Sequence, residues 1–92
     1  MDKYYYVYVL RSEKDGNFYV GYTNNVRKRL EQHNSGQVDS TKRRGPLELI
    51  YWEGCINQQD ATKREKYLKC AWGKRYIKNR LKEYLDEVHP VR

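Results

Sequence analysis

The sequence predicts a mixed α/β fold of the α+β type, in which a small three-stranded sheet, antiparallel or mixed, is flanked by about three helices. Two observations predict this fold. Three runs are dominated by β-branched and aromatic residues, which is typical of strands. Three other segments space their apolar residues as amphipathic helices do, and the order along the chain is ββαβαα. The 92 residues suffice for one core, so we expect a single domain over residues 1–92.

The first two strands are predicted to form a hairpin. Residues 4–11 are almost all β-branched or aromatic, and residues 18–22 form a second run of this kind. Between them, Asp15-Gly16 is a strong signal for a two-residue turn. We therefore expect the two strands to lie side by side.

A helix and a third strand are predicted to follow the hairpin. Thr23 or Asn24 can cap a helix that runs to about Asn34. A polar loop over residues 35–46 then leads to a third strand at residues 47–53.

Two further helices are predicted to complete the fold. Asp60 can cap a helix over about residues 61–72, and Gly73 can end it. The next helix spans roughly residues 75–87, because its apolar residues recur on one stripe, and Pro90 lies beyond it as a terminator.

The charge of the chain is strongly positive. The chain carries 19 Lys and Arg residues against 12 Asp and Glu residues, which gives a formal net charge of +7. Residues 61–82 hold nine basic side chains and one acid, Glu65. We expect a polyanion as partner, because neutralising backbone phosphates releases counterions and gives affinity without reading a base sequence. The alternative is a solvated helix face that is merely rich in lysine.

The composition also excludes several classes of protein. No apolar run approaches the roughly 18–20 residues of a membrane span, which excludes a transmembrane protein. Two cysteines, Cys55 and Cys70, are too few for a disulfide framework and fit a reduced compartment. The start of the chain has no signal-peptide layout. We therefore expect a cytoplasmic protein without membrane partners.

Three charged or titratable side chains fall on predicted apolar helix faces. Arg29 and His33, one turn apart, lie on or beside the face that the first helix turns to the sheet. Glu65 falls inside the apolar stripe of the second helix. An inward charge must find an opposite charge, hydrogen bonds or a metal ion, because burying it alone is costly. Arg29 can instead extend to solvent, His33 can be a satisfied half-buried ring, and Glu65 can pair with a cation.

Two tyrosines, Tyr8 and Tyr19, are predicted to share one face of the sheet, because side chains alternate along a strand. Gly21 leaves the sheet surface open beside them. Most strand tyrosines are half-buried core residues, but these two hydroxyls can also form a pair over a site.

Together these side chains predict a site that hydrolyses phosphodiester bonds. A carboxylate can hold Mg²⁺, an arginine can stabilise negative charge in the transition state, and a phenol or imidazole can orient or deprotonate water. The residues in question are Tyr8, Tyr19, Arg29, His33 and Glu65.

Several ordered motifs are similar to those of one nuclease superfamily. Tyr6-Val7-Tyr8 occupies the place of a first motif, and Tyr19-Val20-Gly21 that of a second. The other segments that fit are the run from Tyr19 to Asn34, Gly45-Pro46-Leu47, and a helix carrying Ala61, Arg64, Glu65, Lys69 and Trp72. On these motifs, nearly the whole chain resembles the GIY-YIG nuclease superfamily, in particular its small stand-alone branch.

This resemblance implies an endonuclease that cleaves DNA with Mg²⁺ or Mn²⁺. Tyr8 and Tyr19 match the motif tyrosines, either of which is a candidate for activating water. Arg29 and His33 match further catalytic positions, and Glu65 matches the metal-binding glutamate. The substrates expected are branched or damaged DNA, as in repair or recombination.

Departures from the family pattern affect the expected DNA contacts. Tyr6 replaces the first-motif glycine, and Tyr22 stands where repair-type members have a lysine near the scissile phosphate. The expected nucleic-acid-binding residues are Tyr22, Lys42, Arg43, Arg44, Lys63, Lys66 and Lys69. The chain lacks the extra domains that usually select a target, so a protein partner is expected to supply target specificity. The alternative functions are a non-catalytic nucleic-acid-binding adaptor and, with less support, a protein-interaction module.

Overall fold

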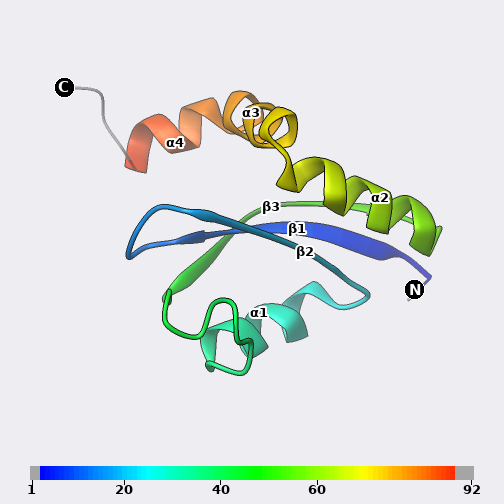
Figure 1. Cartoon of the computed structure of the whole chain (residues 1–92), viewed down its shortest axis with the longest axis horizontal. Coiled ribbons are helices and arrows are strands. Elements are labelled where there is room, and N and C mark those ends of the chain that lie inside the picture. The colour runs from blue at the N-terminus through cyan, green and yellow to red at the C-terminus, as the bar shows by residue number, and fades with distance from the viewer. Residues whose placement is uncertain (1–2, 89–92) are drawn as a thin grey trace.

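The structure, a computed structural model that describes residues 3–88, is a three-stranded sheet covered on both faces by helices (Figure 1). The strands are β1 (Tyr5–Ser12), β2 (Phe18–Thr23) and β3 (Leu47–Cys55). They lie in the order β2-β1-β3, and both pairings are antiparallel. The expected α+β class is therefore confirmed, and of the two alternatives left open for the sheet the antiparallel one is correct.

The β1–β2 hairpin has a longer turn than the sequence predicted. Ser12 N–H donates to the Asn17 carbonyl at 2.9 Å, and Gly16 N–H donates to the Ser12 carbonyl at 2.7 Å. Gly16 has a φ of 74°, a conformation that glycine adopts without steric cost. A two-residue turn at Asp15-Gly16 would pair Tyr8 with Thr23, whereas the structure pairs Tyr8 with Gly21. This shift of two residues leaves every side chain on its predicted face, because side chains alternate along a strand.

The helix α1 (Val26–Asn34) covers one face of the sheet. Its N-cap is Asn25, whose side-chain oxygen accepts the Lys28 N–H at 3.1 Å, so the predicted caps one or two residues earlier are wrong. At the other end, the Asn34 side chain donates to the Leu47 carbonyl at 3.0 Å and accepts the Leu47 N–H at 2.8 Å. These two bonds fasten the end of α1 to the start of β3 and close the intervening loop.

The helix α2 (Gln58–Lys69) begins and ends earlier than predicted. Its N-cap is Asn57, whose side chain accepts the backbone N–H groups of Gln59 and Asp60, so the predicted cap at Asp60 is wrong. The helix stops at Cys70, which has an extended backbone with φ −84° and ψ 172°.

Two helices, α3 (Ala71–Arg80) and α4 (Lys82–Val88), replace the single last helix of the prediction. The break falls at Leu81, which has φ −111° and ψ 28°. Gly73 does not end a helix but lies buried inside α3, where a Cβ would overlap the backbone of α2. A close approach of two helices therefore explains this glycine, and Pro90 lies outside the described residues.

The two faces of β1 belong to two separate cores. Val7 and Val9 pack under α2 and α3, whereas Tyr8, Leu10 and Leu47 form a second core that includes Leu30 of α1. Within residues 3–88, no helix combines the length and apolar character that crossing a membrane requires.

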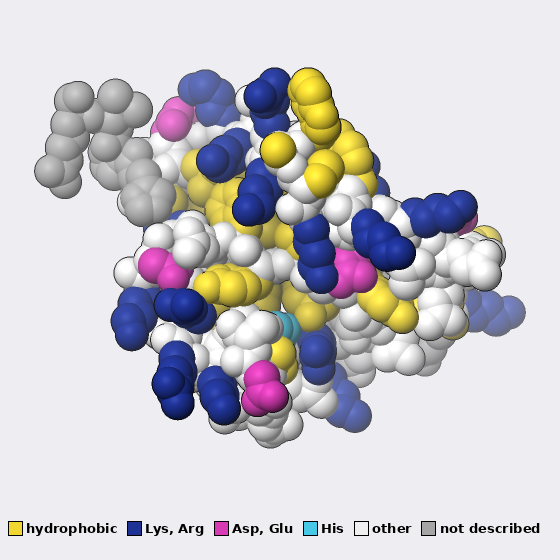
Figure 2. Space-filling view, in the orientation of Figure 1, with side chains coloured by type: hydrophobic (Ala, Val, Ile, Leu, Met, Phe, Trp, Pro, Cys, Tyr) yellow, Lys and Arg dark blue, Asp and Glu magenta, His cyan; other side chains and the backbone are white. Residues whose placement is uncertain are grey.

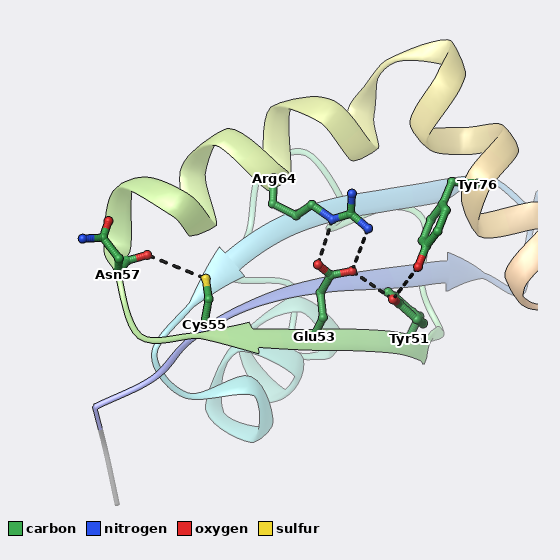
Figure 3. Close-up of polar contacts among 6 residues, drawn as sticks. All are labelled: Tyr51, Glu53, Cys55, Asn57, Arg64 and Tyr76. Atoms are coloured by element: carbon green, nitrogen blue, oxygen red, sulfur yellow. Dashed lines mark hydrogen bonds and ion pairs between the residues drawn. The ribbon is translucent and has the colours of Figure 1, made fainter.

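A polar clamp ties α2 and α3 to the outer strand β3 (Figure 3). Arg64 of α2 donates two hydrogen bonds to the carboxylate of Glu53, at 2.8 and 3.2 Å, and these bonds raise the pKa of Arg64. The Tyr51 hydroxyl donates to the same carboxylate at 2.9 Å and lies 3.4 Å from the Tyr76 hydroxyl of α3. A two-point contact of this kind fixes how α2 is rotated against the sheet.

We expect Gly73→Ala to destabilise the fold. The added methyl overlaps the Tyr67 carbonyl and the Leu68 backbone, which cannot yield as a flexible side chain does. Overpacking should lower the free energy of unfolding by about 2 kcal/mol, measured by urea denaturation. Asn79→Ala, at an exposed position of the same helix, should change it by less than about 0.5 kcal/mol. Equal stability of the two variants would contradict this account of the α2–α3 packing.

Candidate active site

Tyr8 and His33 form the buried centre of the candidate site. Tyr8 projects from β1 toward α1, and its side chain and that of His33 are 4% and 6% exposed. The Tyr8 hydroxyl lies 3.0 Å from His33 Nε2. The first-motif tyrosine and the helix histidine are thus in direct contact.

Gly21 on β2 makes room for the Tyr8 phenol. The two residues face each other across the β1–β2 pair, and a Cβ at position 21 would overlap the phenol oxygen and its ring carbon. The glycine of the second motif therefore serves as the steric complement of the tyrosine of the first motif.

Arg29 brings a positive charge to the same phenol. Its Nε donates to the Tyr8 hydroxyl at 3.3 Å, and its Nη1 donates to Gln32 Oε1 at 3.0 Å. Since Arg29 donates to the Tyr8 oxygen, we assign the phenol's own proton to His33 Nε2. The network then points the Tyr8 proton at a base.

His33 is held as a neutral imidazole. Burial, and secondarily the positive charge of Arg29, lower the pKa of His33 below its usual value near 6.5. The other ring nitrogen, Nδ1, lies 2.7 Å from Thr41 Oγ1 and donates to it when Nε2 accepts from Tyr8. A neutral ring in this tautomer can accept the Tyr8 proton.

A cavity of about 280 Å³ exposes this centre to solvent. It is lined by Tyr8 and His33 together with Tyr19 of β2, Lys69 at the end of α2 and Lys74 of α3. The structure thus brings both motif tyrosines and the histidine to one cavity whose far wall carries ammonium groups.

Glu65 lies on α2, one helical turn before Lys69, which lines this cavity. Its side chain is 18% exposed and pairs with Lys69 Nζ at 3.0 Å. Of the alternatives that the sequence left open for this carboxylate, pairing with a lysine is the one seen here. Because Lys69 also lines the cavity, the carboxylate is connected to the tyrosine centre through that lysine.

Glu65 is suited to a magnesium ion. Among residues 3–88, no group of three or more His, Cys, Asp or Glu side chains is placed to hold a metal. Mg²⁺ in phosphate chemistry needs fewer, since one or two carboxylates, waters and substrate phosphate complete its octahedron. A largely buried carboxylate paired with a lysine of the cavity lining meets that requirement.

The cavity continues as a groove along α3 and α4. Lys74 also lines a second cavity of about 340 Å³ with Lys78 and Tyr19, and Lys78 lines a third with Lys82. Figure 2 shows basic side chains gathered over these helices, with hydrophobic side chains visible in the hollow beside them. A line of ammonium groups therefore leads away from the tyrosine centre.

The predicted cations of the loop before β3 have separate positions. Lys42 lies 3.6 Å from Asp39, and Arg44 lies 3.7 Å from Asp15, while Arg43 is exposed. Their roles as nucleic-acid contacts stay predictions.

The remaining predicted contacts lie on β2 and α2. Tyr22 packs against the core on the α2 side, and its hydroxyl accepts the Gln58 amide at 3.2 Å. Lys63 and Lys66 are exposed on α2, and neither lines the groove described above. These three roles also stay predictions.

Three residues around the site were not predicted from the sequence as site residues: Thr41, Lys74 and Lys78. Thr41 is 1% exposed and orients the histidine, but it sits in an irregular loop that offers no periodic pattern. Lys74 and Lys78 are four residues apart and so share a helix face, a signal that was present within the basic stretch.

Comparison with known proteins identifies the family of the chain. A family model described as the GIY-YIG catalytic domain matches residues 4–80. A UPF0213 protein of Clostridium perfringens is 45% identical over 65 residues, 70% of this chain and 69% of that protein. A UPF0213 protein of Bacillus licheniformis is 41% identical over 86 residues, 89% of this chain and 88% of that protein.

Among solved structures, this chain is similar to the solution NMR structure of a UPF0213 protein from Bacillus halodurans. The match has a TM-score of 0.45 and 31% sequence identity, and it covers 94% of this chain and 85% of the other.

We expect the pKa of His33 to lie below that of a histidine in the urea-unfolded chain, as measured by NMR titration of its ring protons. Arg29→Gln should raise the pKa of His33 only part of the way toward that of the unfolded chain, because burial is the larger cause of the lowering. The folded protein then binds the proton more weakly than the unfolded chain. The free energy of unfolding should therefore be highest above pH ~6.5 and decline as the pH falls through the folded pKa. A His33 pKa at or above the unfolded value would refute the neutral assignment.

Proposed function

The chain belongs to the GIY-YIG family, and we propose that it is a metal-dependent endonuclease that hydrolyses phosphodiester bonds in DNA. The family is a nuclease superfamily, as the sequence motifs predicted. One observation carries the proposal. Tyr8, His33 and Tyr19 line one cavity together with two lysines, and Arg29 donates to the Tyr8 hydroxyl.

Water activation is assigned to Tyr8 with His33 behind it. The neutral His33 ring can accept the Tyr8 proton, and Arg29 donates to the oxygen on which the negative charge would then lie. The phenolate can then remove a proton from a water in the cavity. Tyr19, on the same cavity wall, orients that water or the phosphate.

Charge on the phosphate is balanced from α2. Glu65 would hold Mg²⁺ or Mn²⁺, which supplies Lewis-acid neutralisation of the phosphate and the leaving oxygen. Lys69, which now pairs with Glu65, also lines the cavity, so its ammonium would be available to a phosphate oxygen if Glu65 held the ion. Arg29 would add positive charge from α1, next to the Tyr8 hydroxyl.

The DNA backbone is proposed to follow the groove along α3 and α4. Lys74 and Lys78 recur on this path, and side chains of this kind bind phosphates irrespective of base sequence. Lys82 follows them but is paired with Asp86 at 3.0 Å. Such a surface selects a DNA structure more readily than a sequence, which supports branched or damaged DNA as substrate. A protein partner that chooses the target, and a cytoplasmic location, stay predictions.

The adaptor function has one supporting observation, the Glu65–Lys69 pair, which neutralises the carboxylate without a metal. An adaptor needs the basic groove but has no use for the buried Tyr8–His33–Arg29 contacts. Cleavage assays on catalytic variants separate the two functions.

We expect the wild type to cut supercoiled, single-stranded or branched DNA in the presence of Mg²⁺ or Mn²⁺. Tyr8→Phe removes the hydroxyl proposed to activate water, and Glu65→Gln removes the metal ligand. Each should lower the rate by about 100-fold or more, measured by gel-resolved cleavage.

Tyr5→Phe is the matched control, because Tyr5 lies on the same strand but faces the α2 side. It should retain the wild-type rate. If the wild type cuts none of these substrates, or if Glu65→Gln cuts as fast as the wild type, the chain is not this enzyme.

We expect the groove lysines to carry most of the DNA affinity. In EDTA, the Lys74→Gln/Lys78→Gln double variant should lose affinity on every sequence. Its plot of log affinity against log salt should become shallower by about 2, one for each lost phosphate contact. Fluorescence anisotropy over a salt series measures both quantities.

The Lys63→Gln/Lys66→Gln variant removes the same charge from the exposed side of α2. It should have the smaller effect on the salt slope. An equal or larger effect there would place the binding surface on α2 instead, as the sequence alone suggested.

A further inference from the structure

Trp52 is exposed beside the candidate site and has no role in the chemistry above. It lies opposite Tyr8 in the β1–β3 pairing, so its side chain lies on the α1 face of the sheet. The indole is nevertheless 54% exposed, although aromatic side chains usually contribute most when they are buried. An exposed indole next to the candidate site is available to bind another molecule.

Trp52 lines a cavity of about 420 Å³ on the β3 side of α1. The sheet contributes Tyr6, Leu49 and Trp52 to its lining. The start of α1 and the loop before it contribute Asn24, Asn25, Val26 and Arg27. The cavity thus combines aromatic walls with amide groups and one cation.

The aromatic walls are not closed on each other. The Tyr6 and Trp52 rings meet edge-on, with centroids 5.4 Å apart and planes at 77°. Trp52 therefore keeps a ring face that Tyr6 does not cover, whereas Tyr6 is also stacked by Tyr4, with ring centroids 6.3 Å apart. Tyr6 is held in this place over Gly54, where a Cβ would come within 3.1 Å of its ring carbons.

The polar groups of the cavity fit a nucleotide. Within residues 3–88 the Asn24 side chain makes no hydrogen bond, so its donor and its acceptor are both available to a base edge. Arg27 can pair with a phosphate or stack on a base. The chain has a net charge of +7, so a polyanion is attracted to it, whereas another positively charged protein surface is repelled.

We infer that this cavity binds an unpaired nucleobase of a DNA strand, stacked on Trp52. A base inside a duplex has both faces covered by its neighbours, so only an unpaired or flipped base can use the indole. The inference rests on the proposed nuclease function and names its substrate class: DNA with single-stranded bases next to the cleavage point.

The cavity is adjacent to the catalytic arginine. Asn24 and Asn25 also line a cavity of about 270 Å³ that contains Arg29 and Lys28. The two cavities therefore meet at the loop before α1. A strand whose base enters at Trp52 can pass this loop and present a phosphate to Arg29.

A second copy of this chain is the competing occupant, because β3 is an edge strand and a dimer could cover Trp52. The test must therefore separate DNA binding from self-association. Trp72, which is 65% exposed on α3 and lies under Arg75, gives a matched control for Trp52.

The first experiment follows the emission of Trp52 in the Trp72→Phe variant, in EDTA so that nothing is cut. Addition of single-stranded oligothymidylate should cause a saturable loss of emission, because a stacked base quenches the indole. A blunt duplex that binds at the same protein concentration should cause little loss. Equal quenching by both DNAs, or none by either at saturation, overturns the inference.

The second experiment compares affinities. Trp52→Ala should weaken binding of single-stranded DNA by about 5- to 150-fold, which is the range found when one base-stacking aromatic is removed. Trp52→Phe should retain most of the affinity, and Trp72→Ala should cost less than about twofold. Far-UV spectra and thermal midpoints establish that each variant is folded. An unchanged affinity in a folded Trp52→Ala variant overturns the inference.

The outcomes also distinguish this inference from the proposed function. Quenching of Trp52 without cleavage of any DNA would support base binding at Trp52 and contradict the nuclease function. Cleavage of fully paired duplexes as fast as single strands would support the nuclease function and contradict base binding at Trp52. A dimer in analytical ultracentrifugation that Trp52→Ala converts to a monomer assigns the surface to self-association and overturns the inference.

Discussion

Strand β1 is covered on both faces, and this double burial sets the position of every group in the site. Val7 and Val9 must reach the core under α2 and α3, so Tyr8 between them must point at α1. A shift by one residue would bury the phenol among aliphatic side chains and turn Val9 toward the histidine. Hydrophobic burial on one side of the sheet therefore orients the polar chemistry on the other side. The Glu53–Arg64 contact adds the rotation of α2, the helix that carries Glu65.

The parts of the fold and site that the sequence predicted correctly depend on local periodicity. Alternation along two strands placed Tyr8 and Tyr19 on one face, and the helical repeat turned Arg29 and His33 toward it. These patterns persist in the folded chain because each apolar face must find a covering layer. They indicate which direction a side chain takes, but not which distant group it meets.

What sequence could not predict depends on contacts between segments far apart in the chain. Thr41 reaches the histidine because the Asn34–Leu47 bonds close the loop that carries it. Gly73 resembles a helix terminator by propensity, yet it is required where α3 crosses the end of α2. The break between α2 and α3 at Cys70 sets the direction of α3 and so places Lys74 in the lining of the cavity. The number of basic residues in this stretch does not distinguish Lys74 from its neighbours.

The contact between Gly21 and Tyr8 has a consequence for the descent of the protein. Two positions thirteen residues apart share one volume, since the phenol occupies the space that a side chain at position 21 would take. A larger residue at position 21 would displace the phenol from its contacts with His33 and Arg29. In the descent of the protein, a change at this glycine would therefore disturb the chemistry, although position 21 carries no reactive group.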